Sequence, residues 1–156
     1  MIRIWLTGKN GRDIYALIDD DDVGRVTEYP WSMHKYGYAT TNINGKPTPL
    51  HRFITNASAG QFVDHINRNR LDNRKSNLRF CTFEENLSNS NPRFGRKYKG
   101  VYEEKNGKPK RFHAKATKDR KLYSFGRYYT AEEAARAYDK GIKSLRGEFA
   151  YLNFPE

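Results

Sequence analysis

Short segments in which apolar and polar residues alternate dominate the first part of the chain, and this period of two is typical of half-buried β-strands. Residues 2–6 and 15–18 alternate in this way on either side of Gly8-Lys9-Asn10-Gly11, and a second pair of such segments flanks Asn44-Gly45. Asn-Gly favours the positive φ values of tight turns. The sequence therefore predicts two N-terminal β-hairpins. We expect the aromatic residues of the second one to belong to the core, namely Trp31, Tyr36 and Tyr38.

Four consecutive aspartates, Asp19 to Asp22, lie between the two hairpins. They precede Val23–Val26, so we interpret them as the acidic N-terminus of a helix, where the helix dipole favours negative charge. A group of carboxylates is also typical of a metal site, which is the alternative interpretation.

The middle of the chain predicts a strand, a long loop, a second strand and a helix. Residues 62–65 and 78–82 have strand character, and the polar run 67–76 between them is rich in Asn, Asp and Arg. Thr82 is followed three positions later by Glu85, which is the capping-box pattern of a helix start. The expected unit is therefore β-β-α.

The C-terminal part predicts a separate small domain after a linker over residues 92–97. Three short basic strands are expected near residues 99–102, 111–116 and 122–126. Thr130 and Glu133 form a second capping box, and apolar residues recur behind them at helical spacing.

The predicted fold class is therefore α+β with two domains. N-terminal β-hairpins lead into the ββα unit over residues 1–91, and a separate three-stranded antiparallel sheet backed by one helix occupies residues 98–156.

Charge indicates the class of partner. The 156 residues carry a net charge of +11, and residues 93–156 hold 17 Lys and Arg against 8 Asp and Glu, whereas residues 1–92 hold 12 against 10. This excess indicates a polyanion, and nucleic acid is favoured over a membrane because no long apolar segment occurs. The single cysteine, Cys81, excludes a disulfide within the chain and a Cys-rich zinc site. With no signal segment at the N-terminus, we expect an intracellular protein that is not secreted.

Candidate chemistry is concentrated between residues 64 and 86. Asp64 and His65 are consecutive at a strand end, Asn77 follows His65 by 12 positions, and Asn86 follows Asn77 by 9. Side chains alternate between the faces of a strand, so one of the first two residues can bind a metal while the other contacts substrate. Carboxylate and amide oxygens suit hard cations such as Mg²⁺ or Mn²⁺ better than Zn²⁺.

Residues 50–91 resemble the HNH endonuclease family in its ββα-metal form, known from phage and intron homing enzymes, through Asp64-His65, Asn77-Leu78-Arg79 and Asn86. The resemblance implies that Asp64 and Asn86 ligate one Mg²⁺ or Mn²⁺ per active site, that His65 is the general base, and that Asn77 braces the loop. It also implies cleavage that leaves 3′-hydroxyl and 5′-phosphate ends. Asn86 stands where many relatives carry His.

Arginines around the motif are candidates for phosphate contacts, with Arg74 and Arg79 preferred. His51 lies in the segment Leu50-His51-Arg52-Phe53-Ile54, and a similar segment precedes the motif in similar enzymes, so His51 is a further candidate site residue. The alternative interpretation is that His51 is a helix-start residue that packs on the domain.

Residues 98–155 resemble the plant ethylene-response-factor (APETALA-type) DNA-binding domain, through Tyr98-Lys-Gly-Val, Phe125-Gly-Arg-Tyr, Thr130–Asp139 and Gly147–Pro155. The resemblance implies a three-stranded sheet that enters the major groove. The chain departs from the plant pattern, often Arg or Trp, at Tyr102, Phe112 and Ser124, so base contacts are not carried over. We expect DNA-facing residues on the basic strands and turns: Lys99, Tyr102, Lys110, Arg111, Lys115, Lys118, Arg120 and Lys121.

These observations together predict a site-directed DNA endonuclease of the homing type, which binds double-stranded DNA and nicks one strand per active site. The alternative is a DNA-binding regulator with a non-catalytic HNH scaffold, and Mg²⁺-dependent cleavage separates the two. An RNA-directed nuclease is disfavoured because the aromatic stacking motifs of single-strand readers are missing. We expect no membrane and no obligate protein partner, and a location in the bacterial cytoplasm during phage infection.

Overall fold

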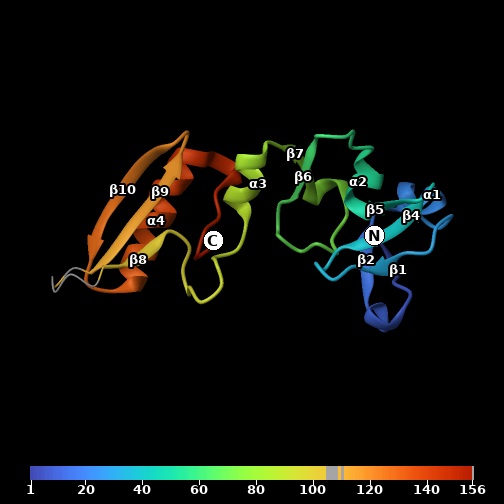
Figure 1. Cartoon of the computed structure of the whole chain (residues 1–156), viewed down its shortest axis with the longest axis horizontal. Coiled ribbons are helices and arrows are strands. Elements are labelled where there is room, and N and C mark those ends of the chain that lie inside the picture. Colours follow the sequence, from blue (N-terminus) through green and yellow to red (C-terminus); the bar gives the residue numbers. More distant parts are fainter. Residues whose placement is uncertain (105–108, 110, 156) are drawn as a thin grey trace. The chain divides into compact units, whose positions relative to one another are not determined.

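The computed structural model describes residues 1–104, 109 and 111–155, so the expected contact of Lys110 lies outside the described residues. The chain mixes α and β structure and divides into two compact units, Met1–Asn86 and Leu87–Glu156 (Figure 1). The described residues form four α-helices: α1 (Val23–Val26), α2 (Leu50–Thr55), α3 (Phe83–Asn89) and α4 (Ala131–Arg146).

The first unit contains three small antiparallel sheets. The hairpin strands β1 and β2 pair with each other, β3, β4 and β5 form a sheet in that order, and β6 pairs with β7. Their bounds are Ile2–Trp5 (β1), Tyr15–Ile18 (β2), Ser32–Met33 (β3), Ala39–Ile43 (β4), Lys46–Pro49 (β5), Phe62–His65 (β6) and Leu78–Cys81 (β7). Short 3-10 turns lie at Lys9–Gly11 (η1), Asp20–Asp22 (η2) and Lys75–Asn77 (η3).

Both predicted N-terminal hairpins are confirmed, although the first turns differently from the prediction. Asn44 and Gly45 have φ values of 50° and 78°, as a tight β4–β5 turn requires. In the first hairpin the positive φ values occur at Gly8 and Asp13 rather than at Asn10-Gly11. The reason is that η1 widens this connection, so the left-handed residues flank the turn.

One apolar cluster holds the first unit together. Trp31 is 1% exposed and packs with residues of β2, α1 and α2, including Ile18, Val26 and Leu50. The expectation that Tyr36 belongs to the core is wrong, because its ring is 60% exposed at the turn between β3 and β4.

The second unit is a three-stranded antiparallel sheet with α4 packed on one face, as predicted (Figure 1). The strands are β8 (Val101–Glu103), β9 (Phe112–Lys118) and β10 (Lys121–Tyr128), in the spatial order β10-β9-β8. Thr130 and Glu133 form the expected capping box at the start of α4, which is followed by a 3-10 turn at Gly147–Phe149 (η4).

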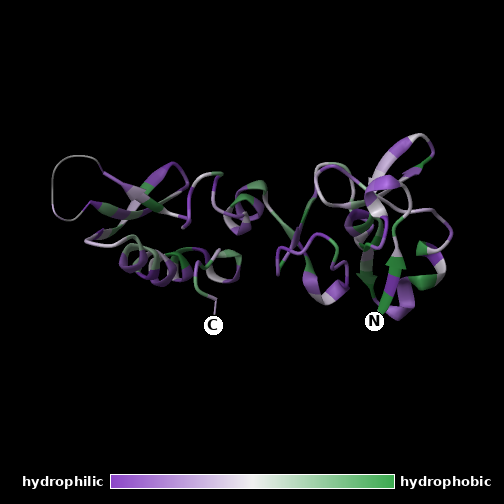
Figure 2. Cartoon of the chain, turned by 90° about the horizontal axis from the view of Figure 1, so that it is seen from below, coloured by the Kyte–Doolittle hydropathy of each residue, from purple (hydrophilic) through white to green (hydrophobic). Residues whose placement is uncertain are grey.

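Small residues allow the helix to approach the sheet closely. Ala114 of β9 and Ala134 of α4 are fully buried, and Tyr138 fills the space beside Gly100, where an added Cβ would lie 1.9 Å from the Tyr138 ring. Hydrophobic and hydrophilic residues are interleaved along the strands and helices of both units (Figure 2). Residues 90–100 contain no helix or strand, and the boundary between the units falls earlier, inside α3.

Candidate active site

The β6–β7 pair places Asp64 and His65 on opposite faces. Asp64 lies directly across from Arg79, and His65 lies across from Leu78 of the core. Residues that face each other in an antiparallel pair share one side of it. Asp64 therefore lies on the same side as Phe62, whose ring contacts Phe83 at the start of α3, whereas His65 points toward the core.

Asp64 is held by a buried ion pair. Its Oδ2 accepts hydrogen bonds from Nε of Arg79 at 3.2 Å and from Nη2 at 2.9 Å. The two side chains are 8% and 10% exposed, so water screens their attraction only weakly. The guanidinium expected to contact phosphate is thus directed at the carboxylate expected to bind metal.

The start of α3 brings Asn86 near this side of the strand pair. Thr82 and Glu85 form the predicted capping box, with Thr82 N donating to Glu85 Oε2 at 2.7 Å and Glu85 N donating to Thr82 Oγ1 at 3.2 Å. Asn86 N then donates to the Thr82 carbonyl at 3.0 Å. The backbone of Asn86 also hydrogen-bonds the Cys81 thiol, which lies across from Phe62 on the Asp64 side.

The donor chemistry around Asp64 fits a hard cation. Burial and, to a smaller extent, the charge of Asp64 raise the pKa of the Cys81 thiol to about 11, so the thiol stays protonated and is a poor zinc ligand. The candidate ligands from the sequence, the Asp64 carboxylate and the Asn86 amide, carry oxygen atoms of the kind that Mg²⁺ and Mn²⁺ prefer.

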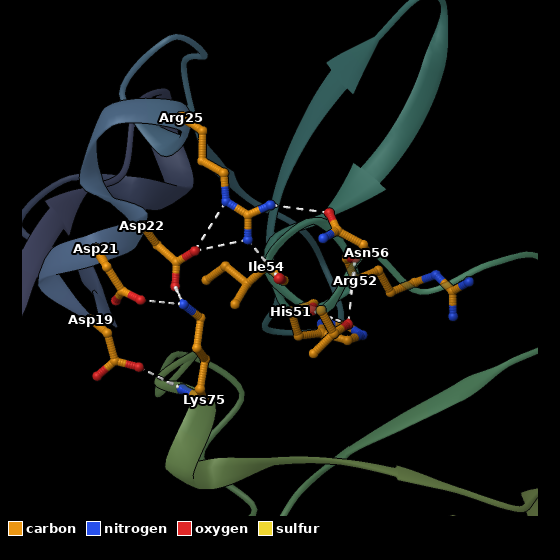
Figure 3. A network of polar contacts seen from close by, with 10 residues as sticks. Asp19, Asp21, Asp22, Arg25, His51, Arg52, Ile54, Asn56 and Lys75 are labelled. Carbon is orange, nitrogen blue, oxygen red and sulfur yellow. Dashed lines mark hydrogen bonds and ion pairs between the residues drawn. The ribbon is translucent and has the colours of Figure 1, made fainter.

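The aspartate run lies at the start of a helical segment, as the interpretation of an acidic helix N-terminus predicts. Asp20, Asp21 and Asp22 form the first turn of η2, which leads directly into α1, although neither Asp19 nor Asp22 makes a side-chain capping hydrogen bond. Within the described part of the chain, Asp19, Asp21 and Asp22 are the one acidic, His or Cys group with converging ligand atoms. Lys75 contacts all three of these aspartates (Figure 3).

Lys75 ties the acidic run to the loop ahead of β7. Its Nζ lies 2.6 Å from Asp21 Oδ2 and 3.1 Å from Asp22 Oδ2, and its backbone N donates to Asp19 Oδ2 at 2.7 Å (Figure 3). Asp22 is 2% exposed and also accepts two hydrogen bonds from Arg25. The acidic run is therefore an anchor for the 67–77 loop, and the Lys75 ammonium group bridges Asp21 and Asp22.

His65 is positioned by Asn73, whose role the sequence did not indicate. His65 Nε2 lies 3.3 Å from Asn73 Oδ1, while Asn73 Nδ2 faces the Arg70 carbonyl at 3.5 Å. An amide oxygen only accepts, so Nε2 carries the proton and Nδ1 keeps the lone pair of a base. Burial lowers the pKa of His65, which favours the neutral ring that a general base requires.

An aromatic group surrounds His65 on the core side. His51 of α2 packs edge-on against it with ring centroids 5.0 Å apart, and Tyr38 lies 5.1 Å from His51 and 6.1 Å from His65. Burial lowers the pKa of His51 to about 3. His51 is 8% exposed, as the packing alternative for this helix-start residue predicts.

Asn77 connects the two ends of the 67–77 loop. Its Oδ1 accepts from Asn67 N at 2.9 Å, and its Nδ2 donates to the Asp72 carbonyl at 2.7 Å. Arg74 forms a two-pronged pair with the buried Asp72 at 2.7 Å for each bond, and this pair lowers the pKa of the Asp72 carboxyl. Asn77 thus has the geometry of a brace, and Arg74 is directed at the loop.

The residues expected to face DNA lie in different settings in the second unit. Lys115 extends over the Tyr102 ring on the sheet face opposite α4, and Arg111 is exposed. Lys99 Nζ instead donates to the carbonyls of Leu87, Ser88 and Ser90, and Lys118 Nζ donates to the Leu145 carbonyl. The two remaining residues are at the β9–β10 turn, where Arg120 has a φ of 62° and Lys121 lies over the Tyr123 ring.

Among the described residues, no helix combines the length and the apolar composition that a membrane-spanning helix needs.

Comparison with known proteins identifies the middle of the chain. A family profile described as HNH endonuclease matches residues 50–88, which include Asp64, His65, Asn77 and Asn86. A curated relative from Acanthamoeba polyphaga mimivirus, named Uncharacterized HNH endonuclease L560, is 33% identical over 149 residues, which cover 92% of this chain and 76% of the relative. No solved structure matches the chain. The matched profile ends before residues 98–156, so it gives no support to the resemblance of these residues to the plant ethylene-response-factor domain.

Proposed function

Because the chain belongs to the HNH endonuclease family, a family of metal-dependent nucleases that act on DNA, we propose that it is a site-directed endonuclease of the homing type. It would cut one strand per active site with one divalent cation, Mg²⁺ or Mn²⁺. The observation that carries the proposal is the opposed placement of Asp64 and His65 at the end of β6, beside α3.

In this mechanism His65 is the general base. The hydrogen bond from Nε2 to Asn73 leaves Nδ1 as the atom that takes a proton from the attacking water. A ring that is already neutral needs no prior loss of a proton, and the His51 ring packed against it limits its rotation. Asn73 and His51 are thus positioning residues, and Asn77 maintains the loop that carries Asn73.

Asp64 and Asn86 would hold the metal ion. When bound there, a divalent cation would polarise the scissile phosphate and stabilise the departing 3′ oxygen. Arg79 keeps the Asp64 carboxylate in one orientation and adds a positive charge beside the position of the phosphate. Direct phosphate contacts by Arg74 and Arg79 would require them to share their hydrogen bonds with Asp72 and Asp64.

The second unit would hold the target DNA through the sheet face opposite α4. The concentration of positive charge in residues 93–156 supports this assignment, and so does the sheet face that carries the exposed Arg111 and the half-buried Lys115 and Tyr102. Arg120 and Lys121 would extend the contact at the β9–β10 turn. Lys99 and Lys118 would contribute less, because helix carbonyls already accept from their ammonium groups. Linking the two units raises the effective concentration of the nuclease at a selected site.

Cleavage of a random duplex library tests the proposal. The full chain is incubated with the library and Mg²⁺, and the new ends are sequenced. We expect cuts enriched at one sequence, with 5′-phosphate ends and nicks in a single strand. The matched control is His65→Ala, which should bind the same DNA and cut at least 100-fold more slowly. Equal cutting by His65→Ala would reject the role of His65, and cuts without sequence preference would reject the homing type.

A further inference from the structure

A chain of hydrogen bonds crosses the open face of the β8–β10 sheet, far in sequence from the nuclease motif. His113 Nδ1 lies 3.0 Å from Glu104 Oε1, and His113 Nε2 lies 2.8 Å from Ser124 Oγ. Arg127 Nε donates to Glu104 Oε2 at 2.9 Å. We call Glu104, His113 and Ser124 the relay.

Strand geometry places the relay on the face away from α4. Phe112, Ala114 and Ala116 pack with α4, so the alternate residues of β9 point the other way. His113 is paired with Arg127 across β10, and Lys115 is paired with Ser124. Ser124 is exposed, whereas His113 beneath it is 5% exposed. The hydroxyl is therefore the accessible end of a largely covered relay.

The relay fixes which way the Ser124 hydroxyl points. Arg127 is the main reason that the pKa of Glu104 is held down to about 2, so Glu104 is a carboxylate and only accepts hydrogen bonds. Nδ1 of His113 must then donate, and in the neutral ring Nε2 must accept. With that neutral ring, the Ser124 proton is directed at His113, and the lone pairs of Oγ face outward.

A hydroxyl that only accepts hydrogen bonds distinguishes among bases. In the major groove, adenine N6 and cytosine N4 are donors, whereas guanine and thymine offer acceptors at the corresponding positions. Lys115, beside Ser124 on the same face, supplies a cation for the neighbouring phosphate. A serine without the relay would donate or accept with equal ease and would distinguish bases poorly.

Resting on the proposed DNA-binding role of the second unit, we infer that Ser124 is a specificity-determining residue, which the relay presets to accept a hydrogen bond from adenine or cytosine. The ligand is double-stranded DNA in the major groove, and the readout concerns one base position. The relay acts through Ser124 and is not itself expected to touch DNA.

Selection from a random duplex library tests this inference. The full chain is assayed in EDTA at about pH 8, and bound sequences are compared for wild type, Ser124→Ala, Ser124→Thr and His113→Leu. We expect wild type and Ser124→Thr to prefer A or C at one position by about 10-fold or more. Ser124→Ala should lose that preference only, and His113→Leu should broaden it because the hydroxyl is no longer oriented. Thermal unfolding of each variant verifies that the second unit remains folded.

Two results would overturn the inference in different ways. An unchanged preference in Ser124→Ala or in His113→Leu would show that Ser124 or the relay reads no base, while the unit still binds DNA. Lys115→Ala tests the proposed DNA-binding role of the sheet independently of base reading by Ser124. This variant should weaken binding to all sequences and reduce the salt dependence of binding. If Lys115→Ala changes neither the affinity for DNA nor its salt dependence, and the wild type shows no base preference, the sheet is not the DNA-binding surface.

Discussion

Asp64 and Arg79 face each other directly across the β6–β7 pair, and the guanidinium holds the carboxylate at 2.9 Å with both side chains almost excluded from water. A buried ion pair contributes little net stability compared with apolar residues, but the loss of one partner leaves an unpaired buried charge. The pair therefore holds a potential metal ligand in one orientation within the first unit.

Removing one member of this pair should destabilise the first unit. We expect Arg79→Ala to lower the free energy of unfolding by about 3–5 kcal/mol, because the buried Asp64 carboxylate loses its ion pair with the guanidinium. Urea unfolding followed by tryptophan fluorescence measures the change. The double variant Asp64→Leu/Arg79→Leu is the matched control and should recover most of the stability without recovering activity. A single variant as stable as wild type would contradict a buried, coupled pair.

Loss of the Asn73 amide should reduce turnover more than binding. In Asn73→Ala the His65 ring loses the acceptor that fixes its protonated nitrogen, so we expect kcat to fall about 10- to 100-fold while KM for DNA changes little. Steady-state cleavage of a defined substrate gives the two constants. Asn73→Ser retains a small acceptor and should recover part of kcat. A rise in KM alone would mean that Asn73 serves the DNA contact instead.

The protein should become less stable as the pH falls, through His51. The folded-state pKa is about 3, below the ordinary value near 6.5, so the unfolded chain binds the proton first. The associated stability is complete above about pH 6.5 and is lost progressively toward pH 3, by up to about 1.4 kcal/mol per pH unit. Unfolding measured from pH 7.5 to 4.5 should show this slope. His51→Phe should reduce this slope and leave the part that comes from His65, whereas His34→Phe removes an exposed ring and should leave the slope unchanged.

An added methyl group at Gly100 should destabilise the second unit alone. Its φ of 73° disfavours any side chain, and the new Cβ would overlap the Tyr138 ring. We expect Gly100→Ala to cost about 2–5 kcal/mol. Calorimetry should show two separate unfolding transitions, and Gly100→Ala should lower the temperature of only one of them. Gly95→Ala is the control because nothing lies within 4 Å of its added Cβ, although its φ is also positive. A shift of both transitions would mean that the units unfold together.

Local patterns predicted most of the elements. The two capping boxes at Thr82 and Thr130 and the Asn44-Gly45 turn act within a few residues, so their signals are in the sequence itself. The contact of the aspartate run with Lys75 was not predictable, because Lys75 lies more than fifty positions away in the sequence. A run of carboxylates has the same local pattern whether it caps a helix, binds a metal or holds a lysine.

The site was predictable in its motif but not in its supporting contacts. The motif spacing singled out Asp64, His65, Asn77 and Asn86, whereas Asn73 was one of several amides in the same polar loop. Which amide meets His65 depends on how the loop folds back over β6, and the Asn77 and Lys75 contacts determine that. Likewise, the sequence did not indicate that Lys99 and Lys118 would bind helix carbonyls.

Metal binding tests the central claim most directly. Mn²⁺ is titrated into the full chain and free Mn²⁺ is measured by electron paramagnetic resonance, for wild type, Asp64→Asn, Asn86→Ala and the control Asp21→Asn. We predict one Mn²⁺ per wild-type chain, at least 10-fold weaker binding in Asp64→Asn and in Asn86→Ala, and binding like wild type in Asp21→Asn. Unchanged binding in Asp64→Asn, or loss of binding in Asp21→Asn alone, would contradict a metal site formed by Asp64 and Asn86.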